Sequence, residues 1–487
     1  MSSATNRNLV NTAYVVAAKN SDASEEASEA SSGKGDEADR VQNALLVRLY
    51  GELTYTELRK FSVLGLTFLF IIGSYWLLRP LKDAVFFSVV GGREWQPIAK
   101  MLSVVVVALV VLVYSRLVDL LSRERLFYVV CLFFASSFFA LALLLAHPTI
   151  GLANDEPSPE RLVGWYTYFL IEAYGSITVS MFWSFVASCT GATSASRGYS
   201  LIVGGAQIGS IAGPLLAANA ETLGVVPLFA LAGCMTLMIA VLLRVFVVYI
   251  GIAAAPGDAA AAPEKKSESG FLEGLKLVAS VPYIRGVALI STLYEVIATI
   301  TDYQMKVLAH ESSKDTATLA AFLGAFGMAT NGLALVAALL GTSFALRHFG
   351  VRWCLLAYPV SVAASSTVLF LFASADASTL LHVFFLVMTL TKGLSYALNN
   401  PAKEMLYIPT SKDTKYKAKS WIDLFGGRLA KALGSTCTTV LRDLPTAEMM
   451  VEAGVGISLV LVIGWLVAAS RVGHLYAKLT ANNEIIQ

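Results

Sequence analysis

The chain has 487 residues, of which 56% are hydrophobic and only 14% are charged, and its mean hydropathy is +0.66. Soluble globular proteins carry about a quarter charged residues, so this composition predicts a polytopic membrane protein whose surface is covered largely by lipid. The net charge is +2 and no basic stripe with interleaved aromatic residues occurs, so nucleic-acid binding is not expected.

The first 40 residues form an acidic segment rich in Ser, Ala, Asp and Glu, without an apolar period. Such a composition is typical of a disordered tail, which we expect in the cytosol. No apolar core follows a basic start, which argues against a secretory signal, and the many acidic residues argue against an organellar transit peptide. Residues 41–60 (VQNALLVRLYGELTYTELRK) predict a short amphipathic helix that leads into the membrane.

Apolar stretches long enough to cross a bilayer occupy most of the remaining chain. They lie near residues 61–88, 97–118, 124–146, 163–188, 198–218, 225–251, 283–308, 317–346, 352–374, 379–401, 419–441 and 449–471. We therefore predict an all-α polytopic membrane protein with twelve transmembrane helices in two six-helix bundles, 61–251 and 283–471. A cytosolic Ala/Pro/Lys-rich linker (252–282) joins them, and a cytosolic tail (472–487) follows. This layout is that of the major facilitator architecture.

The loops alternate in charge along the chain. Basic residues follow the second, fourth and eighth spans and crowd the loop between the tenth and eleventh: Arg116, Arg123, Arg125, Arg197, Arg347, Arg352, Lys403, Lys412, Lys415, Lys417 and Lys419. The intervening loops are poorer in Lys and Arg, and the loop HPTIGLANDEPSPE is acidic. Because cytoplasmic loops carry an excess of Lys and Arg, both termini are predicted to be cytosolic.

The two halves of the chain share a sequence pattern. The segments RGYSLIVGGAQIGSIAG and KSWIDLFGGRLAKALGS, which begin at Arg197 and Lys419, align so that their Gly-Gly pairs coincide. Two repeats of six helices would place a substrate site midway between them. The first segment resembles a phosphate loop, but no GK[ST] follows, and its small residues favour close helix packing instead.

Charged residues lie inside the first span, in the sequence RPLKD. A charge in hydrocarbon costs several kcal/mol by most scales, so such residues face a protein interior or a water-filled path. Arg79 and Asp83 are four residues apart and can pair on one helix face. This pairing would leave Lys82 as a net positive group inside the bundle.

A second cationic pair occurs in the eleventh span, where Arg428 precedes Lys431 by three residues, as Arg79 precedes Lys82. Each pair puts two cations on one helix face. Two such faces, one from each half, could hold a polyanion such as a phosphate chain, because Arg offers forked donors and Lys a compact charge. The alternative is that these side chains extend to the membrane surface.

Two spans carry acidic residues as well. Glu172, in the fourth span, has no local partner, so its partner would come from another helix, Lys82 or Lys431. Asp302, in the seventh span, is one turn from Lys306, and these two residues could simply pair. Carboxylates that face cations across a cavity could hold an empty site closed and release it when an anion binds. Weaker candidates are Asp423, Glu295 and Lys392.

No nucleophile with a nearby base stands out in the sequence, and the five histidines form no group with metal-ligand spacing. We therefore expect no enzymatic activity, no metal site and no cofactor. The expected partners are a small-molecule substrate and the lipid bilayer.

The segment from Pro401 to Ser435 resembles the corresponding stretch of the nucleotide transporter family of obligate intracellular bacteria and plastids, the ATP/ADP translocases that are unrelated to the mitochondrial carrier. The residues that carry the resemblance are Lys403, Glu404, Met405, Tyr407, Ile408, Pro409, Lys417 or Lys419, Asp423, Lys431 and Gly434. The first spans resemble the family at Tyr75, Arg79, Lys82, Asp83, Pro97, Lys100, Phe182, Trp183, Arg197 and Tyr199. The resemblance extends over nearly all of residues 60–435.

This resemblance implies exchange of ATP for ADP across a bacterial inner membrane. It also implies two lysines and two acids in the substrate path, which fall on Lys82, Lys431, Glu172 and Asp302, where the family usually has Glu at the last position. RPLKD has Pro and Leu where typical translocases have an acid and Thr, so the chain resembles a divergent member. By this reading Lys82 and Lys431, with their neighbouring arginines, bind phosphates.

Two other functions are compatible with the sequence. In a proton-coupled importer of nucleotides or of another phosphorylated anion, Glu172 or Asp302 would carry the proton after burial raises its pKa. In a non-transporting receptor or scaffold, the acidic tail and the Lys-rich loop would bind partners. Charges retained in four different spans argue against a scaffold, which has no use for them.

Overall fold

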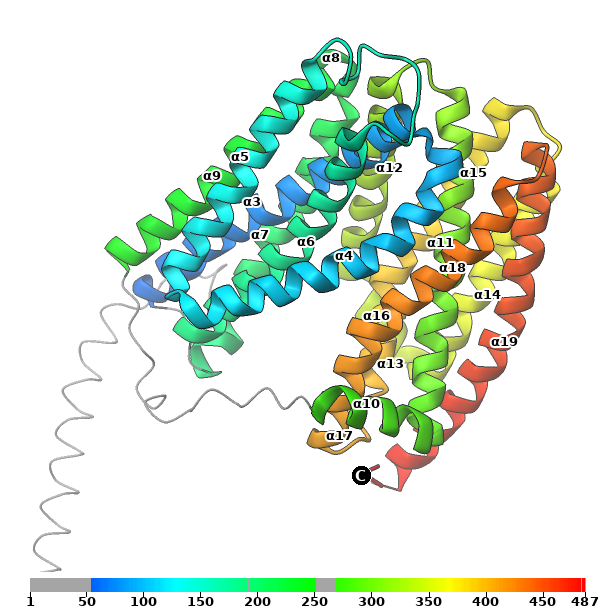
Figure 1. Cartoon of the computed structure of the whole chain (residues 1–487). Coiled ribbons are helices and arrows are strands. Elements are labelled where there is room, and N and C mark those ends of the chain that lie inside the picture. Colours follow the sequence, from blue (N-terminus) through cyan, green and yellow to red (C-terminus); the bar gives the residue numbers. More distant parts are fainter. Residues whose placement is uncertain (1–53, 191, 251–268, 483, 487) are drawn as a thin grey trace, which may run out of the picture.

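The computed structural model describes residues 54–190, 192–250, 269–482 and 484–486. The predicted acidic tail, most of the predicted lead-in helix and the first part of the linker lie outside these residues. The described chain is built of long helices joined by short loops (Figure 1). This confirms the predicted all-α membrane architecture.

The first half begins with α3, whose start is fixed by a capping box between Thr54 and Glu57. The chain then turns at Gly91, where φ is +98°, a backbone conformation that glycine adopts without a steric penalty. The elements are α3 (Tyr55–Phe86), the π-helical η1 (Phe87–Gly91), α4 (Gly92–Leu120), α5 (Arg123–Ala146), α6 (Leu162–Cys189), α7 (Ala192–Ala218), α8 (Ala220–Leu223) and α9 (Val225–Tyr249).

The second half contains three more π-helical segments, each in line with α-helices on both sides. The elements are α10 (Ser269–Ser280), α11 (Pro282–Ser312), α12 (Thr316–Ala337), η2 (Ala338–Thr342), α13 (Ser343–His348), α14 (Gly350–Leu371), α15 (Ala377–Leu394), η3 (Ser395–Asn399), α16 (Asn400–Met405), α17 (Lys412–Trp421), η4 (Ile422–Gly426), α18 (Gly427–Arg442) and α19 (Ala447–Ala481). Every predicted span therefore coincides with one helix or with one such composite helix.

Ten helical runs of the described chain are long and apolar enough to cross a membrane. One of them, Tyr55–Leu120, contains both α3 and α4, while the composite helix α17–η4–α18, rich in basic residues, is not among the ten. The count of twelve therefore stays a prediction.

Two segments predicted to lie outside the membrane spans are partly helical. The predicted tail after residue 471 is helical to Ala481, because Val472 and Tyr476 are buried against the second bundle. The predicted linker contains α10, in which Leu277 and Val278 pack against the same core. In both places an apolar face continues the helix beyond the membrane span.

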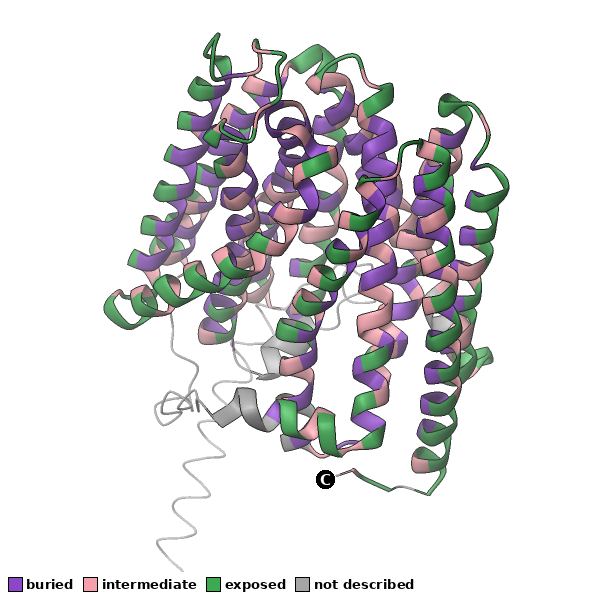
Figure 2. Ribbon diagram, turned by 45° about the vertical axis from the view of Figure 1, so that its right-hand side comes forward, coloured by how far each residue is buried: buried purple, intermediate pink, exposed green. Residues whose placement is uncertain are grey.

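The helices form two bundles (Figure 2). One apolar core fills the first bundle and continues into the second, where it includes Ile300, Leu323 and Phe384, and another core, which includes Trp465, lies in the second bundle alone. In the first bundle α3 packs along α7, and in the second α11 and α14 pack along α19. The glycines of α7 face α3 so closely that a Cβ atom on Gly205 or Gly213 would collide with the carbonyl oxygen of Gly65 or Gly73. This confirms that GGAQIGSIAG is a packing surface rather than a phosphate loop.

The bundles meet through α4 against α18 and through α12 against α3 and α7. Contacts between them cluster at one end, where Arg93 pairs with Glu311 at 2.7 Å and Tyr303 donates to the Arg93 carbonyl at 2.7 Å. Along α7 and α12, Asn331 donates to the Ser210 carbonyl, whereas Gly204 and Gly332, farther from that end, have open space beside them. The bundles therefore separate towards the opposite end.

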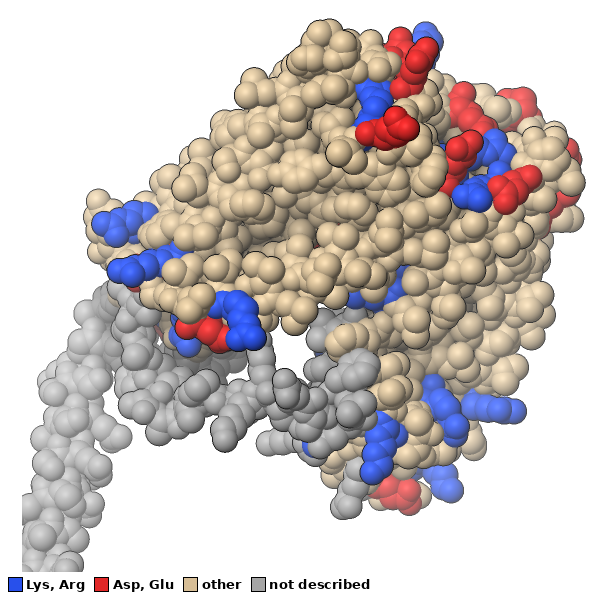
Figure 3. All heavy atoms as spheres, in the orientation of Figure 1, with Lys and Arg blue, Asp and Glu red and all other residues tan. Residues whose placement is uncertain are grey.

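The two ends of the molecule differ in charge (Figure 3). We call the end with the loop 147–161 and the closed bundle contacts the acidic end, because Asp155, Glu156, Glu160, Glu311, Asp315, Asp376 and Glu448 lie there. The opposite end, with α10, α17 and the start of α14, is the basic end. The space-filling view shows a hollow between the bundles on the side of the basic end.

Candidate functional site

A cavity of about 490 Å³ lies between the two bundles. Its size falls within the range of roughly 300–1,000 Å³ that is usual for small-molecule sites. Helices α3, α4 and α6 form one wall, and α11, α15 and the η4–α18 helix form the other. Its charged lining residues are Arg79, Lys82, Asp83, Lys100, Glu172, Glu295, Asp302, Lys306, Lys392, Asp423, Arg428 and Lys431. All the site residues predicted from the sequence are in this set.

Lys82 and Glu172 face each other across the first bundle. The Lys82 Nζ atom donates to Glu172 Oε1 at 2.5 Å, and it also lies 4.4 Å from the centre of the Tyr168 ring. Lys82 is only 5% exposed. Glu172 thus has one of its two predicted partners, and Lys82 does not extend to the membrane surface.

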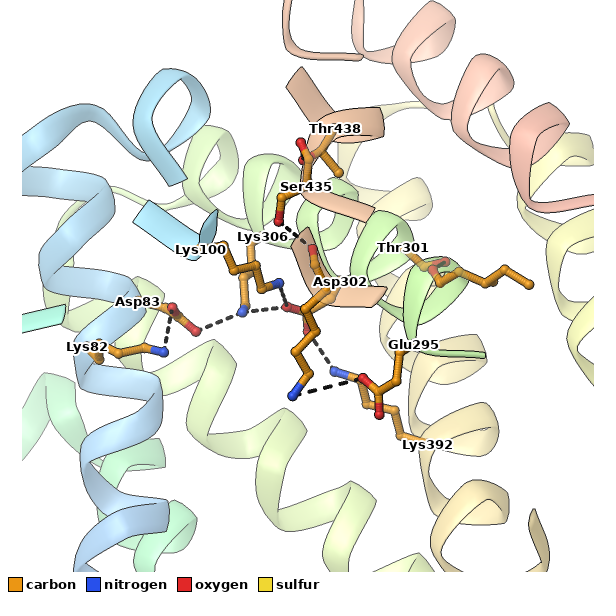
Figure 4. Close-up of polar contacts among 12 residues, drawn as sticks. Lys82, Asp83, Lys100, Glu295, Thr301, Asp302, Lys306, Lys392, Ser435 and Thr438 are labelled. Atoms are coloured by element: carbon orange, nitrogen blue, oxygen red, sulfur yellow. Dashed lines mark hydrogen bonds and ion pairs between the residues drawn. The ribbon is translucent and has the colours of Figure 1, made fainter. Parts of the chain in front are cut away.

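The closest partner of Asp83 comes from the second bundle. Lys306 Nζ lies 2.7 Å from Asp83 Oδ2, and Lys82 Nζ lies 3.6 Å from Asp83 Oδ1 (Figure 4). The predicted Arg79–Asp83 pair is therefore wrong: Lys306 approaches the carboxylate from the facing helix, while the Arg79 guanidinium lies over the Trp76 ring at 4.9 Å. Among the described residues, Arg79 has no acidic group within ion-pair distance.

Asp302 lies among three lysines from three helices (Figure 4). Lys306 donates to Asp302 Oδ2 at 2.6 Å, as one alternative had predicted, and Lys392 donates to Oδ1 at 2.6 Å. The Nζ atom of Lys100 lies 3.6 Å from Oδ2. From the sequence, Lys392 was only a weak candidate and Lys100 had no predicted role, although Lys100 is the first basic residue inside the predicted second span.

Lys431 and Arg428, on α18 of the second bundle, are less closely paired than Lys82. The Lys431 side chain is 53% exposed, and its closest acidic partner, Glu295, is 3.9 Å away. Arg428 lines the same cavity without an acidic group in ion-pair distance in the described chain. These two residues can therefore bind an incoming anion without first leaving a close partner.

The ion pairs connect the two bundles in one network, from Glu172 through Lys82, Asp83 and Lys306 to Asp302. The lining set contains seven basic and five acidic residues, so the cavity has a net positive formal charge. Tyr75, Tyr168, Tyr294 and Tyr396 add aromatic surface. The described residues contain no group of His, Cys, Asp and Glu that could hold a metal ion.

Two membrane-spanning bundles around a central cationic cavity define a membrane transporter of the major facilitator type. The chain matches the model described as the TLC ATP/ADP transporter over residues 38–157 and 164–476. It therefore belongs to the TLC ATP/ADP transporter family, and it is a transporter rather than an enzyme.

Curated relatives align with the chain over most of their length. The chain is 24% identical over 478 residues to ADP,ATP carrier protein 1 of Rickettsia prowazekii, covering 88% of this chain and 95% of the relative. It is 26% identical over 498 residues to the chloroplastic ADP,ATP carrier protein 2 of Arabidopsis thaliana, covering 92% and 80%. With ADP,ATP carrier protein 1 of Chlamydia muridarum it shares 26% identity, covering 88% and 90%. These low identities confirm a divergent member.

Solved structures confirm the fold. A point mutant of the nucleoside transporter NupG aligns with a TM-score of 0.59 at 14% identity, covering 85% of this chain and 99% of that chain. A bacterial homologue of the iron transporter ferroportin in an inward-facing state aligns with a TM-score of 0.60 at 14% identity, again covering 85% and 99%. At such identities the likeness concerns the arrangement of helices alone.

Proposed function

We propose that this protein exchanges ATP for ADP across a bacterial inner membrane by alternating access. The family and the names of its carrier relatives support the substrate. The cavity supports the mechanism, because it lies between two bundles that touch at the acidic end and separate at the basic end. We further propose that the basic end, with both termini, faces the cytosol, as the excess of Lys and Arg there predicts.

The observation that carries the proposal is the placement of Lys82 and Lys431 on opposite walls of one cavity. A phosphate chain between them would contact both bundles at once. Arg79 and Arg428, one turn away on the same helices, would add forked donors to the phosphate oxygens. A nucleotide would thus connect the two moving parts of the transporter.

Glu172 and Asp302 provide the coupling in this mechanism. In the empty cavity Glu172 binds Lys82, and Asp302 binds Lys306 and Lys392 rather than Lys431; these three lysines line the cavity and would otherwise face a phosphate chain. A bound nucleotide competes for these lysines, weakens the network and allows the bundles to rock. An empty carrier keeps the network, so it reorients slowly, and this makes transport an obligatory exchange.

Proton-coupled import is the second candidate, and the ion pairs argue against it. Glu172 and Asp302 each accept from a lysine at 2.5–2.6 Å, so a proton would have to displace that lysine before it could bind either acid. A scaffold role is disfavoured too, because a charged network inside a membrane protein is costly without a function.

Purified protein in liposomes tests the proposal. Vesicles loaded with ADP should take up labelled ATP, and empty vesicles should not. Lys82→Ala and Lys431→Ala should each abolish most of this uptake, while Lys478→Gln, on the exposed end of α19, should leave it unchanged. Uptake into empty vesicles that stops with a proton ionophore would favour proton coupling. Wild-type uptake in both alanine variants would contradict the proposed mechanism.

A further inference from the structure

Three lysines surround the Asp302 carboxylate, but only two of them bind it closely. Lys392 donates to one oxygen and Lys306 to the other, both at 2.6 Å. Lys100 points at the same carboxylate from α4, but its Nζ atom stays 3.6 Å away, beyond hydrogen-bond distance (Figure 4). Both acceptor oxygens are thus already used by shorter contacts.

Lys100 is also the least supported of these three lysines. Lys306 has a second carboxylate, Asp83, at 2.7 Å, and Lys392 lies 4.9 Å from the centre of the Phe326 ring. Lys100 lines the cavity with a side chain that is 19% exposed. An ammonium group that is largely removed from water and has no close acceptor is unfavourable, and an anion in the cavity would supply that acceptor.

Charge balance gives an independent argument. Without Lys100, the connected network would contain three basic residues and three acidic residues: Lys82, Lys306, Lys392, Asp83, Glu172 and Asp302. Such a set is neutral. Lys100 adds the one positive charge that the buried acids do not require.

We propose that Lys100 is a phosphate-binding residue, and that it moves between Asp302 in the empty cavity and a phosphate of the bound nucleotide. This inference rests on the proposed function and adds a cation from α4 to those of α3 and α18. The Lys100–Asp302 contact joins the two bundles, so its transfer to the substrate removes one contact that holds them together. Lys392, from the same bundle as Asp302, positions the carboxylate.

Binding to the full-length purified protein tests the assignment, with ADP and inorganic pyrophosphate as probes in titration calorimetry. Lys100→Gln should raise the dissociation constants of both probes roughly tenfold, the size expected for loss of one charge-assisted contact. Lys100→Arg should retain most of the affinity, and Lys478→Gln should match the wild type. The melting temperature without ligand should not fall in Lys100→Gln, since the remaining network is neutral. Dissociation constants within twofold of the wild type would overturn the inference.

A double-mutant cycle tests the exchange between Asp302 and phosphate. Asp302→Asn removes the competing charge, so ADP should bind more tightly than to the wild type. This gain should shrink in the Lys100→Gln background. An equal gain in both backgrounds would show that Lys100 is not the group for which Asp302 and phosphate compete, and would overturn the inference.

The two proposals fail in different ways. If the wild type exchanges nucleotides and Lys100→Gln exchanges and binds equally well, the inference on Lys100 is wrong and the function stands. If the wild type exchanges no nucleotide but pyrophosphate binding depends on Lys100, the proposed substrate is wrong and the phosphate site stands.

Discussion

Lys82 and Lys431, both proposed to bind phosphate, differ in their surroundings. Lys82 is 5% exposed and lies between Glu172 and Asp83, whereas the Lys431 side chain is 53% exposed with its nearest acid at 3.9 Å. Removal of Lys82 leaves Glu172 without its partner inside the protein, since Asp83 keeps Lys306, while removal of Lys431 leaves no closely paired group behind. The same substitution should therefore affect folding at one position and only binding at the other.

We predict that Lys82→Ala lowers the melting temperature as well as transport. Breaking a buried ion pair costs roughly 3 kcal/mol, although the partly exposed Glu172 will recover some hydration and reduce this value. Lys431→Ala should abolish transport with an unchanged melting temperature. Thermal unfolding of the two variants in the same detergent checks the contrast, and equal destabilisation would contradict it.

We predict that Glu172→Gln binds ADP more tightly than the wild type and makes exchange less strict, so that some labelled ATP also enters vesicles without ADP. The amide keeps the shape of the side chain but carries no charge that competes with phosphate for Lys82. The affinity for phosphate should therefore rise, and the empty carrier should lose an ion pair that slows its reorientation. Dissociation constants and uptake into vesicles with and without ADP, measured on one preparation, check both effects. Weaker binding would show that Glu172 helps to hold the substrate instead of competing with it.

Single residues also show how far the sequence predicts the site. The cost of a charge in hydrocarbon identified Lys82, Glu172, Asp302 and Lys431, because it depends on one helix alone. Pairing between helices depends on the packing of distant segments, so the partner of Asp83 was predicted wrongly and the contact of Lys100 with Asp302 was not predicted. An intramembrane lysine in the second span was a usable signal, but it stood close to the predicted start of that span.

At the scale of elements, the Gly-Gly pattern of α7 recurs in the second half of the chain but has a different role there. In α7, Gly205 packs against α3, but the matching glycines of the second half, Gly426 and Gly427, have no close neighbours. The close approach in the second half occurs at Gly434, where a Cβ atom would lie 2.7 Å from Thr299. The repeat in the sequence therefore predicted the helix but not its packing surface.

We predict that Gly205→Ala strongly destabilises the protein and that Gly204→Ala does not. A Cβ atom at the first position collides with the backbone of Gly65, which cannot move as a flexible side chain would, and overpacking typically costs about 1–3 kcal/mol. A Cβ atom on Gly204 meets no atom within 4 Å. Expression level and melting temperature of this matched pair provide the measurement, and similar values for both would contradict the packing of α3 on α7.

The helix ends at the acidic end provide a contact that holds the cavity closed there. Arg93, at the start of α4, pairs with Glu311 near the end of α11 and donates to the Leu444 carbonyl at 2.9 Å. We predict that Arg93→Ala and Glu311→Ala each change the exchange rate a few-fold, since a partly exposed pair contributes about 1 kcal/mol or less. The charge reversal Arg93→Glu with Glu311→Arg should restore part of the rate. Additive effects in this cycle would show that the pair does not couple the bundles.

Helix limits were predicted within a few residues where hydropathy alone decides them, as in α5 and α6. Where an apolar face continues beyond the predicted span, the helix is longer, as in α19, and α10 was not predicted as a helix. The π-helical segments η1 to η4 had no sequence signal, because one extra residue per turn depends on contacts with neighbouring helices.

For the whole molecule, the separation of charge between the two ends predicts its orientation. We expect a cysteine placed at Asp155, in the loop of the acidic end, to react with a membrane-impermeant maleimide added to intact cells. A cysteine placed at Lys478, near the basic end of α19, should react only after the membrane is permeabilised. The parent chain with its five native cysteines provides the background signal. The reverse labelling pattern would contradict the proposed orientation.

The fixed charge of the cavity has a consequence for energetics. Every acidic group of the connected network already has a lysine partner, so the protein carries the same charge through the membrane on both halves of the cycle. ATP has one more negative charge than ADP, and the connected network contains no unpaired acid that would carry a compensating proton. Each completed exchange would then be electrogenic, and a membrane voltage of 100 mV would bias its direction by about 2.3 kcal/mol.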